Sequence, residues 1–296
     1  MELTKSNLLK CFRNEMDKFI LTLPKSTTTA NKKSNAGKVN KYVKKLRDDL
    51  ISSATKEIKD KEILLEKILL IQYVTYVIML EYRNIVWEYE YMAFSRRIGE
   101  IWEEFCKIPF DFPAEDIEIF EPIDFQAHKR SLQNEVHNYI YGLNISDKEK
   151  NRIQEYFNYV WMLVESGEIS LSLDLHFKTP SMRYNVDYKS GFSSNEKGNT
   201  NRLLLVGSIY DAMETEYKNL IFVRQKEEEN NHYFQTLKNS PYWTAYCGEE
   251  AYKKIGEFTG VNLRKWMNEN IDWHNDISQE FKDSLVKNDI LKYLTW

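Results

Sequence analysis

The chain has 296 residues, of which 42% are hydrophobic and 14% aromatic, with only 10 glycines and 6 prolines. This composition is sufficient for a sizeable buried core and excludes a disordered or linker-rich protein. The net charge is −4, and the three cysteines (Cys11, Cys106 and Cys247) are odd in number and widely spaced, which excludes a disulfide framework and a zinc knuckle.

The charge is distributed unevenly along the chain. Residues 1–60 contain 14 lysines and arginines and 7 aspartates and glutamates, a net of +7, so the remaining 236 residues carry −11. The basic residues are densest at Lys32, Lys33, Lys38, Lys41, Lys44, Lys45 and Arg47. Such a run is able to neutralise phosphates and release their counterions. It is equally typical of an ordinary solvated surface.

The first part of the chain is predicted to be mainly helical. Residues 4–20 are amphipathic, and residues 40–60 and 61–108 hold helix-forming residues with few helix breakers. Residues 24–39 are polar and lack periodicity, which predicts a mobile loop. The apolar stretch 63–80 is interrupted by charged and polar side chains, so we expect a buried helix rather than a membrane span. Because no secretory signal is recognisable at the start, we expect a reduced, cytoplasmic protein.

A polar loop with Pro113 and Pro122 is predicted next, and a second pair of helices follows it. Residues 124–143 are predicted to form the first of the two. Ser146 and Glu149 have the spacing of a capping box, in which the serine side chain accepts a backbone N–H and the glutamate reaches back. The second helix is predicted to run from this box to about residue 165.

From residue 169 the apolar residues fall on every second position, and residues 169–189 are predicted to form a β-hairpin. The turn chemistry is that of Lys178, Thr179, Pro180 and Ser181. The apolar face holds Ile169, Leu171, Leu173, Leu175 and Phe177 in the first arm and Met182, Tyr184, Val186 and Tyr188 in the second. The polar face holds Ser170, Ser172, Asp174 and His176 in the first arm and Arg183, Asn185, Asp187 and Lys189 in the second.

A loop tip at Pro180 and Ser181 sets the pairing of the two arms. The predicted pairs are Leu175 with Val186, Phe177 with Tyr184, Leu173 with Tyr188, Asp174 with Asp187 and Ser172 with Lys189. The apolar faces of the two arms coincide in this register, which supports it.

The remainder of the chain is predicted to complete an α/β half after a polar loop at 190–198. The predicted elements are a helix at 200–216, a buried central strand at 220–223, a helix at 228–238, a strand at 243–247, a helix at 249–258 ended by Gly260, and helices over 261–296 that pack on this core.

The two facing aspartates suggest a metal site. Like charges directly opposite each other destabilise a sheet, and a bound divalent cation reverses that cost. Asp174, Asp187 and the main-chain carbonyl of Tyr188 form an all-oxygen set suited to Mg²⁺. A metal there is able to polarise a phosphodiester and to lower the pKa of a bound water, and Lys189 is placed to activate that water and stabilise the phosphorane. The alternative is a solvent-exposed hairpin face whose charged side chains only confer solubility.

The acid-x-lysine string of Asp187 and Lys189 is weak evidence when it stands alone. It occurs three more times, at Glu57-Ile58-Lys59, Glu216-Tyr217-Lys218 and Glu280-Phe281-Lys282. Those three strings lie in segments predicted to be helical. Only the Asp187 string lies in a predicted strand, faces an acid across a hairpin, and precedes a predicted helix and buried strand.

Asp174, twelve intervening residues and then Asp187-Tyr188-Lys189 resemble the motif of the PD-(D/E)xK nucleases. The helix and strand predicted at 203–213 and 220–223 also match that family's core order. The resemblance covers about residues 95–250 and departs from the motif at Leu173, where the family has proline. It implies a mixed sheet flanked by helices, Mg²⁺-dependent phosphodiester cleavage and, often, a homodimer on double-stranded DNA.

Residues 95–105 resemble the helix that carries an accessory glutamate in many type II restriction endonucleases, on the spacing of Gly99 and Glu103. By this resemblance Glu103 helps to orient the metal or its water, with Glu104 and Glu100 as alternatives. The other interpretation is an amphipathic helix with a solvated acidic face.

Other features are less specific. His176 is interpreted as a hydrogen-bonded bystander rather than a metal or phosphate contact. The loop at 190–199 has serine and asparagine side chains suited to DNA, and it is also typical of a plain loop. The aromatic residues at 230–234 and 242–243 are interpreted as core packing rather than a base-stacking surface. The sequence has no Walker loop, nucleophile elbow or histidine pair at metal-ligand spacing.

These features predict an α/β fold: a mixed β-sheet flanked by helices in a restriction-endonuclease-like core (95–260), with a helical, basic N-terminal region (1–94) and a C-terminal helical extension (261–296). The resemblance implies a type II restriction endonuclease that hydrolyses duplex DNA at a short specific site with Mg²⁺, with the catalytic residues Asp174, Asp187, Lys189 and Glu103. The alternatives are a repair or structure-specific nuclease of the same superfamily, and a non-catalytic helical interaction protein.

Overall fold

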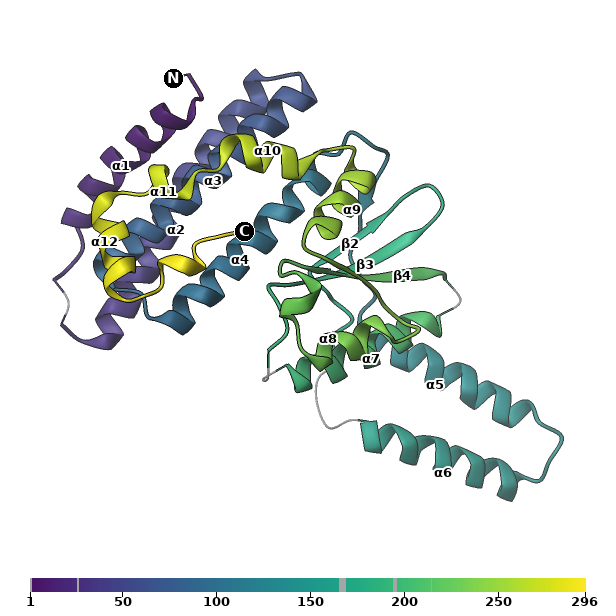
Figure 1. Cartoon of the computed structure of the whole chain (residues 1–296). Coiled ribbons are helices and arrows are strands. Elements are labelled where there is room, and N and C mark those ends of the chain that lie inside the picture. Colours follow the sequence, from purple (N-terminus) through teal and green to yellow (C-terminus); the bar gives the residue numbers. More distant parts are fainter. Residues whose placement is uncertain (1, 26, 165–168, 194–195, 214) are drawn as a thin grey trace.

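The computed structural model describes residues 2–25, 27–164, 169–193, 196–213 and 215–296. A group of long helices lies at one end of the molecule, a five-stranded sheet with its covering helices lies beside it, and a helical hairpin projects from the far side of the sheet (Figure 1).

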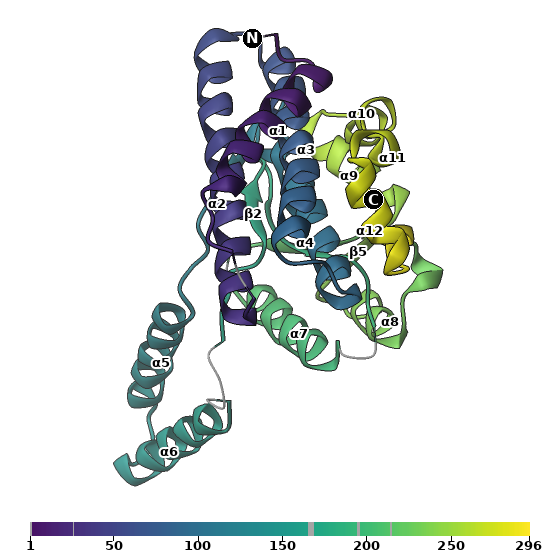
Figure 2. The ribbon, with the colours of Figure 1, turned by 90° about the vertical axis from the view of Figure 1, so that its left-hand side faces the viewer.

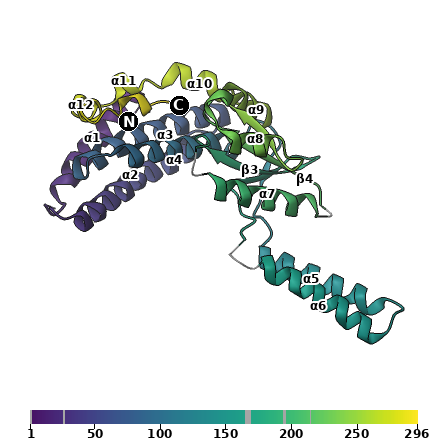
Figure 3. The same cartoon turned by 60° about the horizontal axis from the view of Figure 1, so that its bottom comes forward.

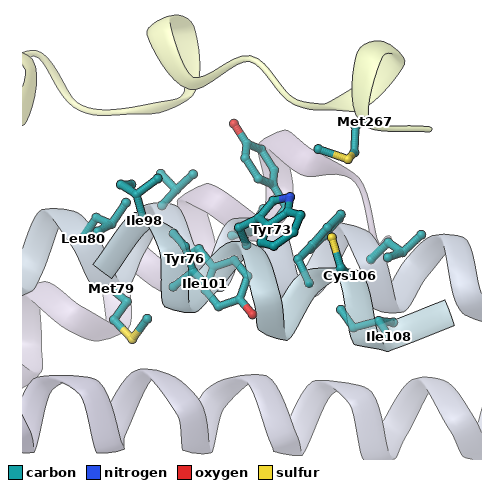
Figure 4. Packing of buried hydrophobic residues seen from close by; sticks show 14 of the residues in the cluster. Tyr73, Tyr76, Met79, Leu80, Ile98, Ile101, Cys106, Ile108 and Met267 are labelled. Carbon is teal, nitrogen blue, oxygen red and sulfur yellow. The ribbon is translucent and has the colours of Figure 1, made fainter. Parts of the chain in front are cut away.

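Four long helices form the N-terminal region: α1 (Lys5–Leu21), α2 (Thr29–Glu57), α3 (Lys61–Val86) and α4 (Tyr91–Asp111). Most of α3 is buried, and its side chains meet those of α4 around Tyr73, Tyr76, Ile98 and Ile101 (Figure 4). Among the described residues, α3 is the one helix long and apolar enough to cross a membrane. Its enclosure by the other helices makes it the core helix of a soluble protein, as predicted.

The loop predicted at 24–39 is wrong over most of its length, because α2 begins at Thr29. Thr28 caps the helix by accepting the backbone N–H of Asn31 at 3.3 Å. The side chains that turn inward here are Asn35, Ala36 and Val39. This packing stripe contains an asparagine and a small residue, so it lacks the apolar periodicity by which a helix is recognised.

The sheet has the order β1-β2-β3-β4-β5. Its strands are β1 (Glu118–Ile119), β2 (Leu175–Lys178), β3 (Arg183–Lys189), β4 (Tyr217–Val223) and β5 (Thr244–Cys247). The first three strands pair antiparallel, whereas β3, β4 and β5 run parallel. The mixed sheet is therefore as predicted, and β4 is a buried interior strand next to the middle strand, β3.

The predicted hairpin register is confirmed where the two arms pair. Leu175 lies opposite Val186, and Phe177 lies opposite Tyr184. The turn is closed by a hydrogen bond of 2.9 Å from the backbone N–H of Thr179 to the Met182 carbonyl.

The first arm of the hairpin is shorter than predicted, because residues 169–174 are not part of β2. Side chains take the place of a strand partner there. The hydroxyl of Tyr210 donates to the Leu171 carbonyl at 2.8 Å, and the backbone N–H of Leu173 donates to His176 at 2.9 Å. Leu171 is still buried, against Phe125 and Tyr210. In this segment the alternating pattern therefore indicates which side chains are buried, although the segment does not pair as a β-strand.

Helices cover both faces of the sheet. On one face lie α7 (Lys197–Asp211) and α8 (His232–Lys238), and on the other lie α4 and α9 (Glu249–Thr259). The ring of Trp102 in α4 meets that of Tyr188 in β3 edge-on, with 5.8 Å between centroids. Gly260 ends α9 with a φ of 73°, as its position in the sequence predicts.

The projecting hairpin consists of α5 (Phe125–Gly142) and α6 (Asp147–Val164), which we call the arm (Figures 1 and 3). The predicted capping box is present. The backbone N–H of Ser146 donates to Glu149 at 3.0 Å, and the N–H of Glu149 donates to the Ser146 hydroxyl at 3.4 Å. The predicted end of this helix near residue 165 falls just outside the described residues.

The C-terminal segment forms α10 (Leu263–Asn270), α11 (Trp273–Asp276), α12 (Gln279–Lys287) and the 3-10 turn η2 (Leu291–Tyr293). These helices are as predicted, but they run along α1, α3 and α4 more than along the sheet (Figures 1 and 2). Arg13 joins the segments: it pairs with Glu81 at 2.7 Å and donates to the Asp276 carbonyl at 2.6 Å.

Three smaller predictions are wrong. The polar segment around Pro113 and Pro122 contains the edge strand β1. The helix predicted at 228–238 is divided into the 3-10 turn η1 (Glu227–Glu229) and α8. The string that ends at Lys218 runs into β4 rather than a helix.

Candidate functional site

The carboxyl end of β3 carries two of the predicted site residues in contact with each other. Asp187 is only 1% exposed, and its Oδ2 atom lies against the ammonium group of Lys189. The same ammonium group donates to the Tyr188 carbonyl at 3.1 Å. Lys189 therefore supplies positive charge to two of the three oxygen donors that the sequence suggests for a metal.

Asp174 reaches this place from the segment before β2. The β2–β3 ladder ends at the pair of Leu175 and Val186, so the predicted strand pairs of Asp174 with Asp187 and of Ser172 with Lys189 do not form. Instead, Oδ2 of Asp174 accepts the backbone N–H of Tyr188 at 2.7 Å. This hydrogen bond continues the contact between the two arms after the regular ladder has stopped.

Glu103 comes to the site from α4. A glycine one turn earlier permits a close approach, because a Cβ atom on Gly99 would lie 3.0 Å from Cβ of Ser190, the residue that follows β3, and the serine would have to shift slightly. This close approach sets α4 against the end of the strand. Glu103 pairs with Lys107 at 2.7 Å.

The pKa of Glu103 is raised above its usual value, first by burial and then by the negative charge of Asp174. Lys107 and Lys189 act in the opposite direction. Glu103 therefore belongs to the same electrostatic cluster as Asp174 and Lys189.

The two alternative acids of α4 have other partners. Glu104 accepts from Lys44 at 3.5 Å and from the Tyr76 hydroxyl at 3.1 Å. Glu100 pairs with Arg96 at 3.2 Å and with Arg97 at 2.8 Å.

Burial also raises the pKa of Asp187. The positive charge of Lys189 opposes this shift, Asp174 adds to it, and Arg202 opposes it more weakly. Arg202, in α7, approaches Oδ1 of Asp187 at 3.4 Å. Two cations thus share one buried carboxylate, and a second carboxylate lies near enough to repel it.

Sequence reasoning did not single out Arg202 or Lys107. Lys107 lies four residues after Glu103, which is the helical spacing for an ion pair, and that signal is visible in the sequence. Arg202 has no such local signal, because only the packing of α7 on the sheet brings it to Asp187.

His176 is a hydrogen-bonded bystander, as predicted. Its Nε2 atom accepts the backbone N–H of Leu173 at 2.9 Å, so the proton lies on Nδ1, which donates to Asn185 at 2.8 Å. Asn185 in turn donates to Asn219 at 2.9 Å. These polar side chains are buried under α7, so this part of the polar hairpin face contacts protein rather than solvent. Burial lowers the pKa of His176.

The donors near β3 fit a small, oxygen-liganded cation in part. Oδ2 of Asp187 is buried and has no hydrogen-bond partner of good geometry, and Asp174 and the Tyr188 carbonyl are the other oxygen donors beside it. Over the described ranges, no group of three or more histidine, cysteine, aspartate or glutamate side chains is arranged to hold a metal ion. A Mg²⁺ ion bound here would have two carboxylates and one carbonyl as its protein ligands, with water as the remaining ligands.

Two other candidate surfaces lie around the sheet. Residues 194–195 of the loop at 190–199 fall outside the described residues, so the loop is not described as a whole. Among the aromatic residues at 230–234 and 242–243, Phe234 and Trp243 are buried in the core between the sheet, α7 and α8. The indole of Trp243 donates to the Leu203 carbonyl at 2.8 Å. These two rings pack the core, as predicted.

Comparison of the chain with protein-family models, with curated proteins and with solved structures finds no match. The likeness to the PD-(D/E)xK nucleases therefore stays a resemblance of motif and element order.

Proposed function

We propose that this chain is a Mg²⁺-dependent DNA endonuclease whose site lies at the carboxyl end of β3. The observation that supports the proposal is the meeting of Asp187, Lys189, Asp174 and Glu103, which come from three separate segments. The positive partners of these carboxylates are Lys189, Arg202 and Lys107. Burial, with the negative charge of Asp174 adding to it, raises the pKa of both Asp187 and Glu103, and raised pKa values of this kind are typical of functional sites.

Each residue has a part in the proposed chemistry. Asp187, Asp174 and the Tyr188 carbonyl hold the cation, which when bound polarises the scissile phosphodiester and lowers the pKa of a water. Lys189 holds the attacking water and balances the charge that develops on the phosphate. Glu103, kept in place by Lys107 at 2.7 Å, orients that water. Arg202 offsets the charge of Asp187 while no substrate is present.

The finer proposal is a type II restriction endonuclease that acts in the cytoplasm as a homodimer on a short duplex site. A repair or structure-specific nuclease would use the same residues. Sequence-specific plasmid fragments support the first, and activity restricted to flaps or junctions supports the second.

A second candidate function, a non-catalytic interaction protein, is favoured by the arm. Tyr139, Tyr156, Tyr159 and Val160 expose between 56% and 71% of their surface there. Exposed apolar side chains of this kind are typical of protein contacts. A non-enzyme binds no Mg²⁺ through Asp187, so a calorimetric Mg²⁺ titration of wild type and Asp187→Ala separates the two candidates.

Plasmid cleavage in Mg²⁺ tests the proposal directly. We expect cleavage by the wild type and at least a roughly 100-fold loss in Lys189→Ala and Asp187→Ala. The matched control is Glu216→Ala with Lys218→Ala, which removes the same string from exposed positions at the opposite end of β3 and β4. Wild-type rates in Asp187→Ala or Lys189→Ala, or no cleavage by the wild type of any duplex, flap or junction, would refute the assignment.

A further inference from the structure

The basic run of the N-terminal region lies on a continuous helix. Between residues 29 and 47, α2 has seven basic residues and no acidic one. Lys38, Lys41 and Lys45 are exposed, and their spacing of three and four residues places them on one side of the helix. None of the three forms an ion pair with any residue that the structure describes. We call these three lysines the basic face.

The basic face borders an open hollow between the end of α1 and α2. The hollow has a volume of about 790 Å³, and its apolar lining includes Phe19, Leu23 and Tyr42. The rings of Phe19 and Tyr42 are stacked at 4.1 Å between centroids, with 5° between their planes. The rim holds four lysines and one acid, Asp48, whose charge is balanced by Arg47 at 2.7 Å. Such a mainly cationic rim around an apolar floor complements a sugar-phosphate backbone, which alternates anionic phosphates with less polar sugars.

The basic face is connected to the candidate site through α4. Lys44, on the neighbouring side of α2, contacts Glu104 at 3.5 Å, and Glu104 directly follows Glu103. Lys41 lies three residues before Lys44, about 4.5 Å along the helix axis. Lys44 thus joins α2 to the helix that carries Glu103, and α2 and α4 run in the same helical group (Figure 3).

We propose that the basic face binds the phosphate backbone of duplex DNA beside the scissile bond, an inference that rests on the nuclease function proposed above. The face extends about 10 Å from Lys38 to Lys45, which corresponds to about three steps of 3.4 Å along one strand. The contact is electrostatic and independent of sequence. It holds the duplex on α2 while the end of β3 acts on it.

The test is duplex binding measured by fluorescence anisotropy in EDTA, so that no strand is cut. The variant is Lys38→Gln, Lys41→Gln and Lys45→Gln combined. The control is Lys148→Gln, Lys218→Gln and Lys253→Gln, which removes the same net charge from exposed lysines elsewhere. Thermal denaturation shows whether both variants fold, and three single variants replace the triple variant if it does not.

We expect the basic-face variant to bind at least ten times more weakly than the control at 0.1 M salt. Its slope of log affinity against log salt falls by about 2.7, since each phosphate contact contributes about 0.9. Equal affinities and slopes in the two variants, or no binding by the wild type, overturn the inference. So does unchanged duplex binding together with lost binding to phosphatidylserine vesicles, which assigns the face to a membrane surface.

The inference and the proposed function fail separately. If the wild type cleaves DNA in Mg²⁺ and the basic-face variant keeps its affinity and salt slope, only the basic face is refuted. If the variant loses affinity as expected but the wild type never cleaves, the nuclease function is refuted, and the claim that the face lies beside a scissile bond falls with it.

Discussion

Asp174 accepts the backbone N–H of Tyr188 through Oδ2 at 2.7 Å, just beyond the pair of Leu175 and Val186 at which the regular β2–β3 ladder ends. A single carboxylate thereby satisfies a backbone donor and stands beside Asp187. In a regular ladder the carbonyl of a neighbouring strand would take that N–H. The departure from the ladder is thus what brings the second carboxylate to the site.

Substitutions of Asp174 separate its two roles. Asp174→Ala leaves the Tyr188 N–H without its partner and is expected to cost about 1–3 kcal/mol. Asp174→Asn keeps an oxygen acceptor, so we expect a loss of less than about 1 kcal/mol, yet Mg²⁺ binding should weaken as much as in the alanine variant. Urea denaturation and calorimetric Mg²⁺ titration measure the two effects. Equal destabilisation by both substitutions would show that the hydrogen bond is not what holds Asp174.

Asp187 makes the metal-free protein sensitive to pH. Burial raises its pKa above the unfolded value of 3.8, so its contribution to stability is fully present below that value and is lost as pH rises through the folded pKa. In EDTA at pH 7.5, Asp187→Asn should therefore denature at a higher temperature than the wild type, and the difference should shrink towards pH 4.

Added Mg²⁺ should reverse the order of the two proteins in that comparison. Cation binding to the charged carboxylate stabilises the wild type, whereas the amide of Asp187→Asn is a poor ligand. A lower melting temperature for Asp187→Asn in EDTA at pH 7.5 would mean that the contact with Lys189 outweighs the cost of burial.

The sequence predicts those parts of the fold that local patterns encode. The turn at Pro180 and Ser181 and the alternation together give the register of Leu175 with Val186, because a shift by one residue would turn every apolar side chain outward. The capping box at Ser146 and Glu149 is likewise readable from its spacing. The strand β1 is not readable, since two residues, Glu118 and Ile119, form it only by pairing with β2.

In the candidate site, too, local sequence predicts some contacts and tertiary packing determines the others. Asp187 and Lys189 lie two residues apart on the same face of one strand, so their contact could be predicted. The position of Asp174 depends on a ladder that stops early, and Arg202 arrives with α7; both depend on tertiary packing. The sequence predicts a loop at the start of α2 because Asn35 and Ala36 form much of the buried stripe of this helix. An expectation based on apolar periodicity does not detect such a helix.

Replacing Gly99 by alanine, a change that usually stabilises a helix, should destabilise this protein. Alanine is favoured over glycine inside a helix by about 1 kcal/mol, but a Cβ atom on Gly99 would lie 3.0 Å from Cβ of Ser190. We expect Gly99→Ala to be destabilising by about 1–3 kcal/mol, as overpacked sites are. Gly37→Ala is the control, since Gly37 in α2 has nothing within 4 Å of the added atom, and it should be neutral or stabilising.

Ser190→Gly tests the cause of that cost. In urea denaturation, Gly99→Ala should be less harmful in the Ser190→Gly background than in the wild type, because the atom it meets is gone. The serine also accepts from Arg224 at 3.0 Å and 2.8 Å, so the single variant Ser190→Gly sets the baseline. Additive effects of the two substitutions would place the strain elsewhere.

The protein should lose stability on acidification because of His176. Its neutral form accepts from Leu173 and donates to Asn185, and burial lowers its pKa below the usual 6.5. A lowered folded pKa means that the unfolded chain takes up the proton first, so the stabilisation is present above about pH 6.5 and is lost as pH falls through the folded pKa.

The variant His176→Leu removes the titration and leaves two buried polar groups without partners, at a cost of about 1–3 kcal/mol for each group at pH 7.5. Urea denaturation of wild type and variant at pH 7.5 and pH 5.0 measures the gap, which should narrow at the lower pH. A gap that widens on acidification would mean that the folded protein binds the proton at His176 more tightly than the unfolded chain does.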